Sequence, residues 1–114
     1  MADPECLFCK IVAGDIPSER VHEDGEVIVF RDIAPRAPTH VLAIPRRHVA
    51  SVADLGDDDG RLLAALFAAL RRVAADTGLA DYRIVTNVGP RAGQSVFHLH
   101  FHLLGGRPLS WPPG

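Results

Sequence analysis

The sequence predicts an α+β fold in which an antiparallel sheet of about five strands accompanies one long helix and a short N-terminal helix. Two observations predict this class. One stretch of the chain repeats apolar side chains at spacings of three and four, as an amphipathic helix does. The other apolar stretches are short and are separated by turn residues, as are strands joined by tight connections. A length of 114 residues predicts a single domain, residues 1–114.

The N-terminal half should contain the short helix and three strands. Residues 6–12 have a helical pattern that stops before Gly14. Residues 21–23 and 27–31 predict a hairpin that turns at residues 23–25. Residues 32–38 contain two prolines and predict a loop, whereas residues 39–45 alternate in the manner of a strand.

The long helix is expected over residues 57–77. Acidic side chains at 57–59 favour its positive N-terminal end, and Gly78 is placed to cap its C-terminus. Strands at 82–87 and 96–104 complete the sheet. The apolar face of the helix should consist of Leu63, Leu66, Phe67, Leu70, Val73 and Ala74.

Composition excludes several classes of partner. A formal net charge of −2 gives no electrostatic basis for binding nucleic acid or an acidic membrane. No apolar stretch reaches 18 residues, and the chain begins with an acidic segment where a signal peptide would be basic. We therefore expect a cytoplasmic protein, in which the Cys6-x-x-Cys9 pair indicates metal or redox chemistry more than a structural disulfide.

Half of the six histidines lie in the run His98-Leu99-His100-Phe101-His102. On a strand, all three imidazoles would project from one face, about 6.6 Å apart, and the apolar residues from the other. Three readings are open: histidines satisfied in the core, a metal site using His100 and a neighbour, and catalysis on a phosphorylated substrate. Catalysis is favoured because imidazole serves as nucleophile, proton donor and proton acceptor near neutral pH.

A glycine-rich segment, residues 87–96, leads directly into this run. Alone, such a segment is most often a plain hairpin loop. Joined to the histidines, its small residues would let backbone N–H groups approach an anion. The sequence therefore predicts an anion cradle with a nucleophile at its edge.

The segment from Gly93 to Leu104 resembles the signature of the histidine triad family, His-x-His-x-His-x-x with apolar x. The resemblance extends over nearly the whole chain, to Asp32-Ile33, Thr39-His40 and residues 44–48. The tail, Gly105-Gly106-Arg107 and Trp111 to Gly114, is similar to that of the HINT branch of purine nucleoside phosphoramidases. The resemblance implies a homodimer that binds purine nucleoside monophosphates and hydrolyses adenosine or guanosine 5′-monophosphoramidates.

The resemblance also implies roles for individual residues. His100 would be the nucleophile that forms a nucleotidyl-histidine intermediate, with His40 behind it. His102 and Ser95 would contact the phosphate and the leaving amine. Asp32 would bind the ribose hydroxyls, although an acid before such a loop is often only a turn residue. The remaining nucleotide contacts would come from Phe8, Ile11, Ile16, Ile33, Leu42, Asn87, Gly93, Gln94, Val96 and, across the dimer, Trp111.

Members of this family from bacteria often carry a Cys-x-x-Cys pair that binds zinc. The resemblance implies a closed, structural zinc site completed by two histidines, with ligands Cys6, Cys9, His48 and His98. No cofactor would be required for the chemistry. Unligated cysteines and a redox pair are the alternatives, and the redox reading is weaker because no strand precedes the pair.

Other functions compete with the phosphoramidase. The closest is a hydrolase of dinucleoside polyphosphates; a nucleotidyl transferase is disfavoured because that branch replaces the last histidine of the triad with Gln, and this chain has His102. A regulatory protein that binds nucleotides and catalyses only incidentally is a second alternative. A zinc hydrolase that uses His98, His100 and the cysteines as catalytic ligands is a third.

Overall fold

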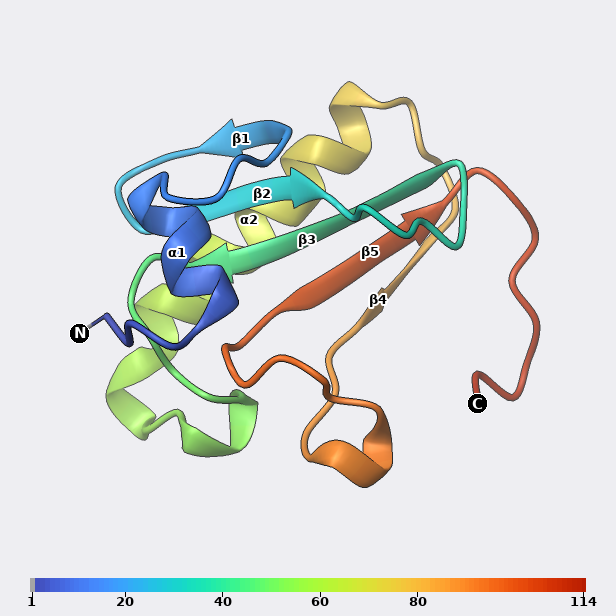
Figure 1. Cartoon of the computed structure of the whole chain (residues 1–114). Helices are drawn as coiled ribbons and strands as arrows, with labels where there is room; N and C mark the ends of the chain where they lie inside the picture. Colours follow the sequence, from blue (N-terminus) through green and yellow to red (C-terminus); the bar gives the residue numbers. More distant parts are fainter. Residues whose placement is uncertain (1) are drawn as a thin grey trace.

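The computed structural model describes residues 2–114 and contains one five-stranded antiparallel sheet with two α-helices (Figure 1). The strand order is β1-β2-β3-β5-β4, which leaves β1 and β4 at the edges. The predicted α+β fold is confirmed. The elements are α1 (Leu7–Ala13), β1 (Arg20–Glu23), β2 (Val27–Arg31), β3 (Thr39–Pro45), α2 (Gly60–Asp76), β4 (Tyr82–Val85) and β5 (Phe101–Gly105), with short 3-10 turns at Val52–Asp54, Asp57–Asp59 and Pro90–Ala92.

The two helices cover opposite faces of the sheet (Figure 1). Because alternate residues of a strand point to opposite sides, one strand can contribute apolar side chains to both faces. In β2, Val27 and Val29 pack toward α2, whereas Ile28 and Phe30 pack toward α1. The α2 side holds the larger apolar cluster. The α1 side holds a smaller one, consisting of Cys6, Phe8, Cys9, Ile11, Ile28, Phe30, Leu42 and Ile44.

The long helix begins three residues later than expected. Asp57–Asp59 form a separate 3-10 turn, in which the Asp59 carboxylate accepts hydrogen bonds from the Gly56 N–H and the Arg47 guanidinium, both at 2.8 Å. The C-terminal prediction is confirmed. Gly78 adopts φ +73° directly after the helix, and its N–H donates to the Ala75 carbonyl at 3.1 Å.

The apolar face of α2 is rotated slightly from the expected one. Leu62, which was not among the predicted positions, is buried, while Leu63 is only partly buried. Phe67 remains 36% exposed although its ring lies edge-on to Phe101, with centroids 5.2 Å apart. The other four predicted positions are buried: Leu66, Leu70, Val73 and Ala74.

The expected strand 96–104 is wrong over its first five residues, since β5 begins at Phe101. Residues 96–100 are held instead by contacts with the chain after β3: the Leu99 N–H donates to the Val49 carbonyl at 2.6 Å. The strand expected at 82–87 likewise ends early, at Val85. The predicted alternation is nevertheless kept, because Leu99, Phe101 and Leu103 all lie in the core beneath α2.

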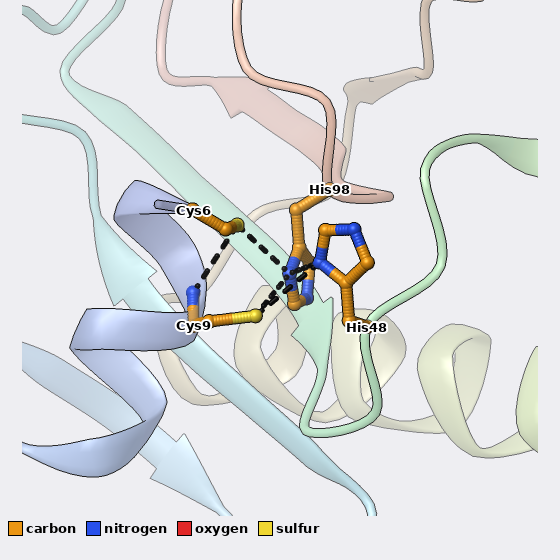
Figure 2. Close-up of side chains that lie close together, drawn as sticks. All are labelled: Cys6, Cys9, His48 and His98. Atoms are coloured by element: carbon orange, nitrogen blue, oxygen red, sulfur yellow. Dashed lines mark hydrogen bonds between the residues drawn. The ribbon is translucent and has the colours of Figure 1, made fainter. Parts of the chain in front are cut away.

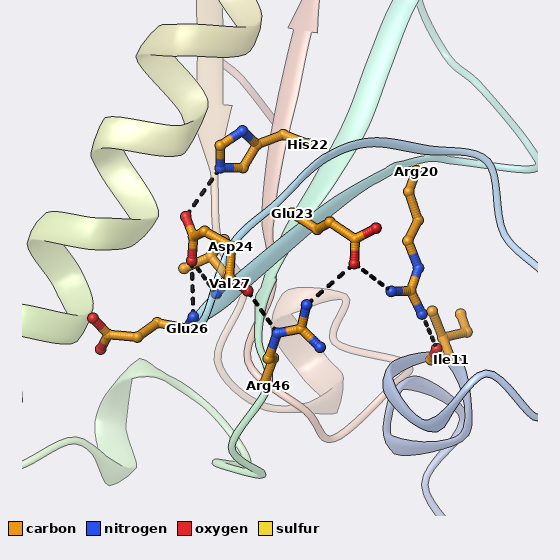
Figure 3. A network of polar contacts seen from close by, with 8 residues as sticks. All are labelled: Ile11, Arg20, His22, Glu23, Asp24, Glu26, Val27 and Arg46. Carbon is orange, nitrogen blue, oxygen red and sulfur yellow. Dashed lines mark hydrogen bonds and ion pairs between the residues drawn. The ribbon is translucent and has the colours of Figure 1, made fainter.

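A polar network joins α1 to the β1–β2 hairpin and to the end of β3 (Figure 3). The Arg20 guanidinium donates to the Ile11 carbonyl at 2.7 Å and to the Glu23 carboxylate at 2.9 Å. Arg46 reaches the same carboxylate at 3.2 Å and the Asp24 carbonyl at 2.7 Å. The network anchors the C-terminal end of α1 against the sheet.

Within residues 2–114, no helix combines the length and the apolar character that crossing a membrane would require. The segment after β5 is irregular and ends away from the sheet (Figure 1).

Candidate active site and metal centre

A pocket of about 300 Å³ lies between α1, the loop after β2 and the segment that precedes β5. Its walls combine apolar side chains with two imidazoles, a carboxylate, a guanidinium and two hydroxyls. Ten residues singled out in the sequence line it: Phe8, Ile11, Ile16, Asp32, Ile33, Leu42, Ser95, Val96, His100 and His102. Five further residues line the pocket that were not predicted from the sequence: Leu7, Pro17, Ser18, Phe30 and Arg31.

Phe30 could have been found from strand pairing. It lies opposite Leu42 in the β2–β3 register, so the two side chains project from the same face. The Phe30 ring also packs edge-on against Phe8, with centroids 5.5 Å apart. Together these three residues form the apolar floor of the pocket.

His100 is held in one tautomer by the backbone. Its Nδ1–H donates to the carbonyl oxygen of His98 at 2.7 Å, so Nε2 is left with its lone pair. The Phe8 ring stands edge-on to the imidazole at 90°, with centroids 5.1 Å apart. The imidazole is buried but lines the pocket. A neutral, oriented imidazole of this kind can act as a nucleophile.

His40 and His102 form a hydrogen-bonded pair between β3 and β5. The Arg36 N–H donates to His40 Nδ1 at 3.0 Å, which leaves the proton of His40 on Nε2. That Nε2–H donates to His102 Nδ1 at 2.9 Å, so the proton of His102 is on Nε2. The chain of donors therefore presents an N–H of His102, not a lone pair.

Both imidazoles of this pair are held neutral. Burial, with smaller contributions from the neighbouring His100 and His40, lowers the pKa of His102 to about 4, against the opposing effect of the Asp32 carboxylate. Burial also lowers the pKa of His40, against the opposing effect of the Asp32 carboxylate, whose oxygen lies 3.4 Å from His40 Nε2.

Asp32, His40 and His102 place three potential metal ligands close together. A metal on His40 Nε2 would require the proton to move to Nδ1, where the Arg36 N–H already donates. The hydrogen-bond pattern therefore favours proton positioning over metal binding at these three side chains.

Four of the predicted nucleotide contacts lie outside the pocket lining. Asn87 lines a separate depression on the tail side, which it shares with His102. Trp111 is 81% exposed in the C-terminal segment. Gly93 adopts φ +101° at the end of the 3-10 turn, where a Cβ would lie 3.8 Å from the Asn87 amide nitrogen. The fourth residue is Gln94.

Gln94 has a buried side chain that organises the glycine-rich loop. Its amide oxygen accepts from the Gly89 N–H at 2.9 Å, and its amide nitrogen donates to the Ala50 and Val96 carbonyls at 2.7 and 3.1 Å. The Gln94 backbone N–H also donates within the loop, to the Gly89 carbonyl at 3.0 Å, so Gln94 shapes the loop and does not contact the pocket.

A second cluster lies beside the pocket and consists of Cys6, Cys9, His48 and His98 (Figure 2). Their ligand atoms lie within 4.8 Å of one another. Cys6 Sγ lies 3.4 Å and Cys9 Sγ 3.6 Å from His98 Nδ1. The Nδ1 atoms of His48 and His98 are 3.2 Å apart. A tetrahedral zinc site with bonds of about 2.3 Å to sulfur and about 2.0 Å to nitrogen has S–N edges near 3.5 Å and N–N edges near 3.3 Å. The donor set therefore fits zinc.

The surroundings of the cluster favour a metal. The His98 Nε2–H donates to the Pro45 carbonyl at 2.9 Å, which turns the Nδ1 lone pair toward the two sulfurs. Burial lowers the pKa of His98 to about 4, which keeps the ring neutral. The Cys9 N–H donates to Cys6 Sγ at 3.4 Å. The Asp3 N–H donates to Cys9 Sγ at 3.3 Å. Such donors stabilise thiolates.

The chain is similar to several known proteins over most of its length. Residues 5–108 match the family model described as the scavenger mRNA decapping enzyme C-terminal binding domain. An uncharacterized HIT-like protein from Synechococcus elongatus is 45% identical over 111 residues, 96% of this chain and 97% of the relative. A HIT family hydrolase from Legionella pneumophila is 50% identical, with a TM-score of 0.94 over 96% of this chain and all of the other. The histidine triad nucleotide-binding protein from Candida albicans is 33% identical, with a TM-score of 0.82 over 95% of this chain and 83% of the other.

Proposed function

The chain belongs to the histidine triad (HIT) family, and from that premise we propose that it is a hydrolase that cleaves the P–N bond of purine nucleoside 5′-phosphoramidates. One observation carries the proposal: His100 donates from Nδ1 to the His98 carbonyl and keeps a nucleophilic Nε2 in a pocket of nucleotide size. The hydrolase class has support from the Legionella pneumophila protein, and nucleotide binding from the Candida albicans protein.

The proposed reaction has two displacements at phosphorus. His100 Nε2 attacks the phosphorus as the bond to the amine breaks, and the departing nitrogen takes a proton from water at the Ser95 hydroxyl. His102 donates its Nε2–H to a non-bridging oxygen and stabilises the charge that develops there. Water then attacks the nucleotidyl-histidine, restores the lone pair of His100 and returns its proton to the hydroxide that the first step left. Over both steps, one water supplies a hydroxyl to phosphorus and a proton to the amine.

The pocket residues suit the two parts of a nucleoside. The apolar floor of Phe8, Phe30 and Leu42 fits the faces of a purine base. Asp32 is held by the Ala34 N–H, which donates to its carboxylate at 2.8 Å, and so can accept hydrogen bonds from both ribose hydroxyls. The N–H groups of Gly93 and Gln94 donate within the loop, to the Pro90 and Gly89 carbonyls at 3.1 and 3.0 Å. The backbone N–H groups of Ser95 and Val96, with the Asn87 amide, would therefore complete the phosphate site.

We assign structural zinc to Cys6, Cys9, His48 and His98. The four donors account for a closed coordination shell, so bound zinc would supply stability and no catalytic step. This assignment gives the three histidines of the triad separate roles, metal binding for His98 and phosphate chemistry for His100 and His102. The two free cysteines suit a reducing compartment such as the cytoplasm.

A homodimer is part of the proposal. Strand β4 lies at an open edge of the sheet, and an edge of this kind offers unpaired backbone groups to a second copy. The exposed Trp111 lies on the irregular tail and would reach the partner's pocket from there.

The direct test is turnover of a fluorogenic purine nucleoside phosphoramidate, measured beside a dinucleoside tetraphosphate. We expect hydrolysis of the phosphoramidate with the higher kcat/KM, and full activity in EDTA. Preferential cleavage of the tetraphosphate would move the protein to the polyphosphate hydrolases. Loss of activity in EDTA with retention of the fold would indicate catalytic zinc.

A further inference from the structure

Thr86 is the first residue after β4, and its hydroxyl donates to the carbonyl oxygen of His100 at 2.8 Å. The two residues are 14 positions apart in the chain and enclose the glycine-rich loop between them. Figure 1 shows this loop as the excursion that connects β4 to β5. One side-chain hydrogen bond therefore joins the start of the loop to the backbone of the nucleophile.

The Thr86 hydroxyl takes the place of a backbone donor. The β4–β5 ladder ends with the pair Val85 and His102, and two further residues in the same register would pair Asn87 with His100. The backbones of Asn87 and His100, both among the described residues 2–114, form no hydrogen bond with each other. Since the carbonyl of a buried residue needs a hydrogen-bond partner, the hydroxyl supplies what the ladder does not.

The backbone around the nucleophile is held on two sides. Toward β3, the next residue, Phe101, pairs with Ala43. Toward β4, the Thr86 hydroxyl is the donor that reaches the His100 carbonyl. Removal of the hydroxyl would release the backbone on the β4 side alone and leave the pairing of β3 with β5 in place. The effect should therefore fall on the rate more than on the fold.

The loop that begins after Thr86 carries the groups assigned above to the phosphate. Asn87 follows Thr86 directly, and Ser95 and Val96 lie at the far end of the loop. His100 Nε2 can attack only if its distance from a phosphorus held by these groups is kept short. A displacement of about 1 Å between reacting groups can cost about 100-fold in rate.

We propose that Thr86 is a positioning residue for the nucleophile, whose hydroxyl fixes the backbone of His100 relative to the phosphate-binding loop. The inference rests on the proposed function and adds a residue that acts without contacting substrate, since Thr86 is not among the residues that line the pocket. The role belongs to the hydroxyl, so serine can replace threonine, whereas valine, which has the same shape and no donor, cannot.

The test compares Thr86→Val with Thr86→Ser. We expect the valine variant to lower kcat for the phosphoramidate about tenfold and to change KM by less than about twofold, and the serine variant to keep about half of the wild-type kcat. Thr77→Val is the control, because the Thr77 hydroxyl donates to the Val73 and Ala74 carbonyls at 2.8 and 3.2 Å at the end of α2. This control should lose stability and keep the wild-type kcat.

Hydrogen exchange of the backbone amides keeps the role testable if wild type hydrolyses no phosphoramidate. We expect Thr86→Val to speed exchange about tenfold at residues 87–101, with wild-type exchange in α2, and Thr86→Ser to restore slow exchange. A wild-type kcat in an active Thr86→Val, or an equal loss in the valine and serine variants, overturns the positioning role and leaves the proposed function standing. Exchange that is equal in Thr86→Val and wild type overturns the role whether or not the protein is a phosphoramidase.

Discussion

His40 Nε2 lies 2.9 Å from His102 Nδ1, and this contact joins a buried imidazole on β3 to one on β5 that lines the active-site pocket. Because the Arg36 N–H donates to the other nitrogen of His40, His40 must be the donor in this hydrogen bond and His102 the acceptor. We therefore propose that His40 is a positioning residue, which sets the tautomer of His102 and does not contact the substrate.

Loss of this contact should weaken catalysis without abolishing it. We expect His40→Ala to lower kcat about tenfold, since one hydrogen bond that orients His102 is lost, and His40→Gln to recover part of the rate through its amide N–H. Nitrogen NMR of the histidine side chains should show His102 losing its single tautomer in the alanine variant. A single tautomer in both variants would remove His40 from this role.

The nucleophile is tested by His100→Ala. We expect phosphoramidase activity to fall by several orders of magnitude while circular dichroism stays that of the wild type, because the variant removes the attacking nitrogen and leaves the core. Rapid quenching of wild type with substrate should trap a nucleotidyl adduct on this residue. Wild-type rates in the variant would contradict the covalent mechanism.

Asp32 should confer a preference for ribose over deoxyribose. A missing 2′-hydroxyl leaves a partly buried carboxylate without a donor, which we expect to weaken kcat/KM by roughly 1–3 kcal/mol. Asp32→Asn should reduce the difference between the two substrates. Equal use of ribose and deoxyribose by wild type would restrict Asp32 to holding the loop through the Ala34 N–H.

Stability should decline on mild acidification. The pKa of His102 is about 4 in the folded chain, against 6.5 for an ordinary histidine, so the unfolded chain binds more protons between these values. The free energy of unfolding therefore falls as pH drops from 6.5 to 4, by at most about 1.4 kcal/mol per pH unit for this group. Urea titrations of wild type and His102→Gln should show the smaller slope in the variant; identical slopes would mean that His102 does not titrate this way.

Zinc should be present at one equivalent per chain by elemental analysis. Cys6→Ser with Cys9→Ser should abolish binding and lower the melting temperature, because the metal ties the N-terminal segment to the sheet. His22→Gln, which removes an imidazole outside the cluster, is the control and should retain the metal. Metal retained by the double serine variant would show that the ligands are misassigned.

Local pattern predicted most of the fold. The alternation around His100 and the repeat in α2 depend on neighbouring residues, and both were evident in the sequence. The late start of the strand expected at 96–104 was not, because it depends on contacts of Leu99 with Val49 and of His98 with Pro45, about fifty residues away in the chain. The burial of Leu62 depends in the same way on how α2 lies on the sheet.

In the candidate site, too, features that follow from a local sequence pattern could be predicted and features that depend on distant contacts could not. Ten pocket residues were found because a family pattern marks them together, whereas Phe30 became visible only through its pairing with Leu42. The tautomers of His40 and His102 could not be predicted, since they are set by the Arg36 N–H and by the approach of β3 to β5.

The alternation from His98 to Leu103 also limits how this protein can evolve. Inserting or deleting one residue within it would exchange the two sets of side chains, placing imidazoles under α2 and leucines in the pocket. Descendants can change this stretch by substitution but not by a change in length. The turn before α2, which serves neither the pocket nor the metal centre, is free of that restriction.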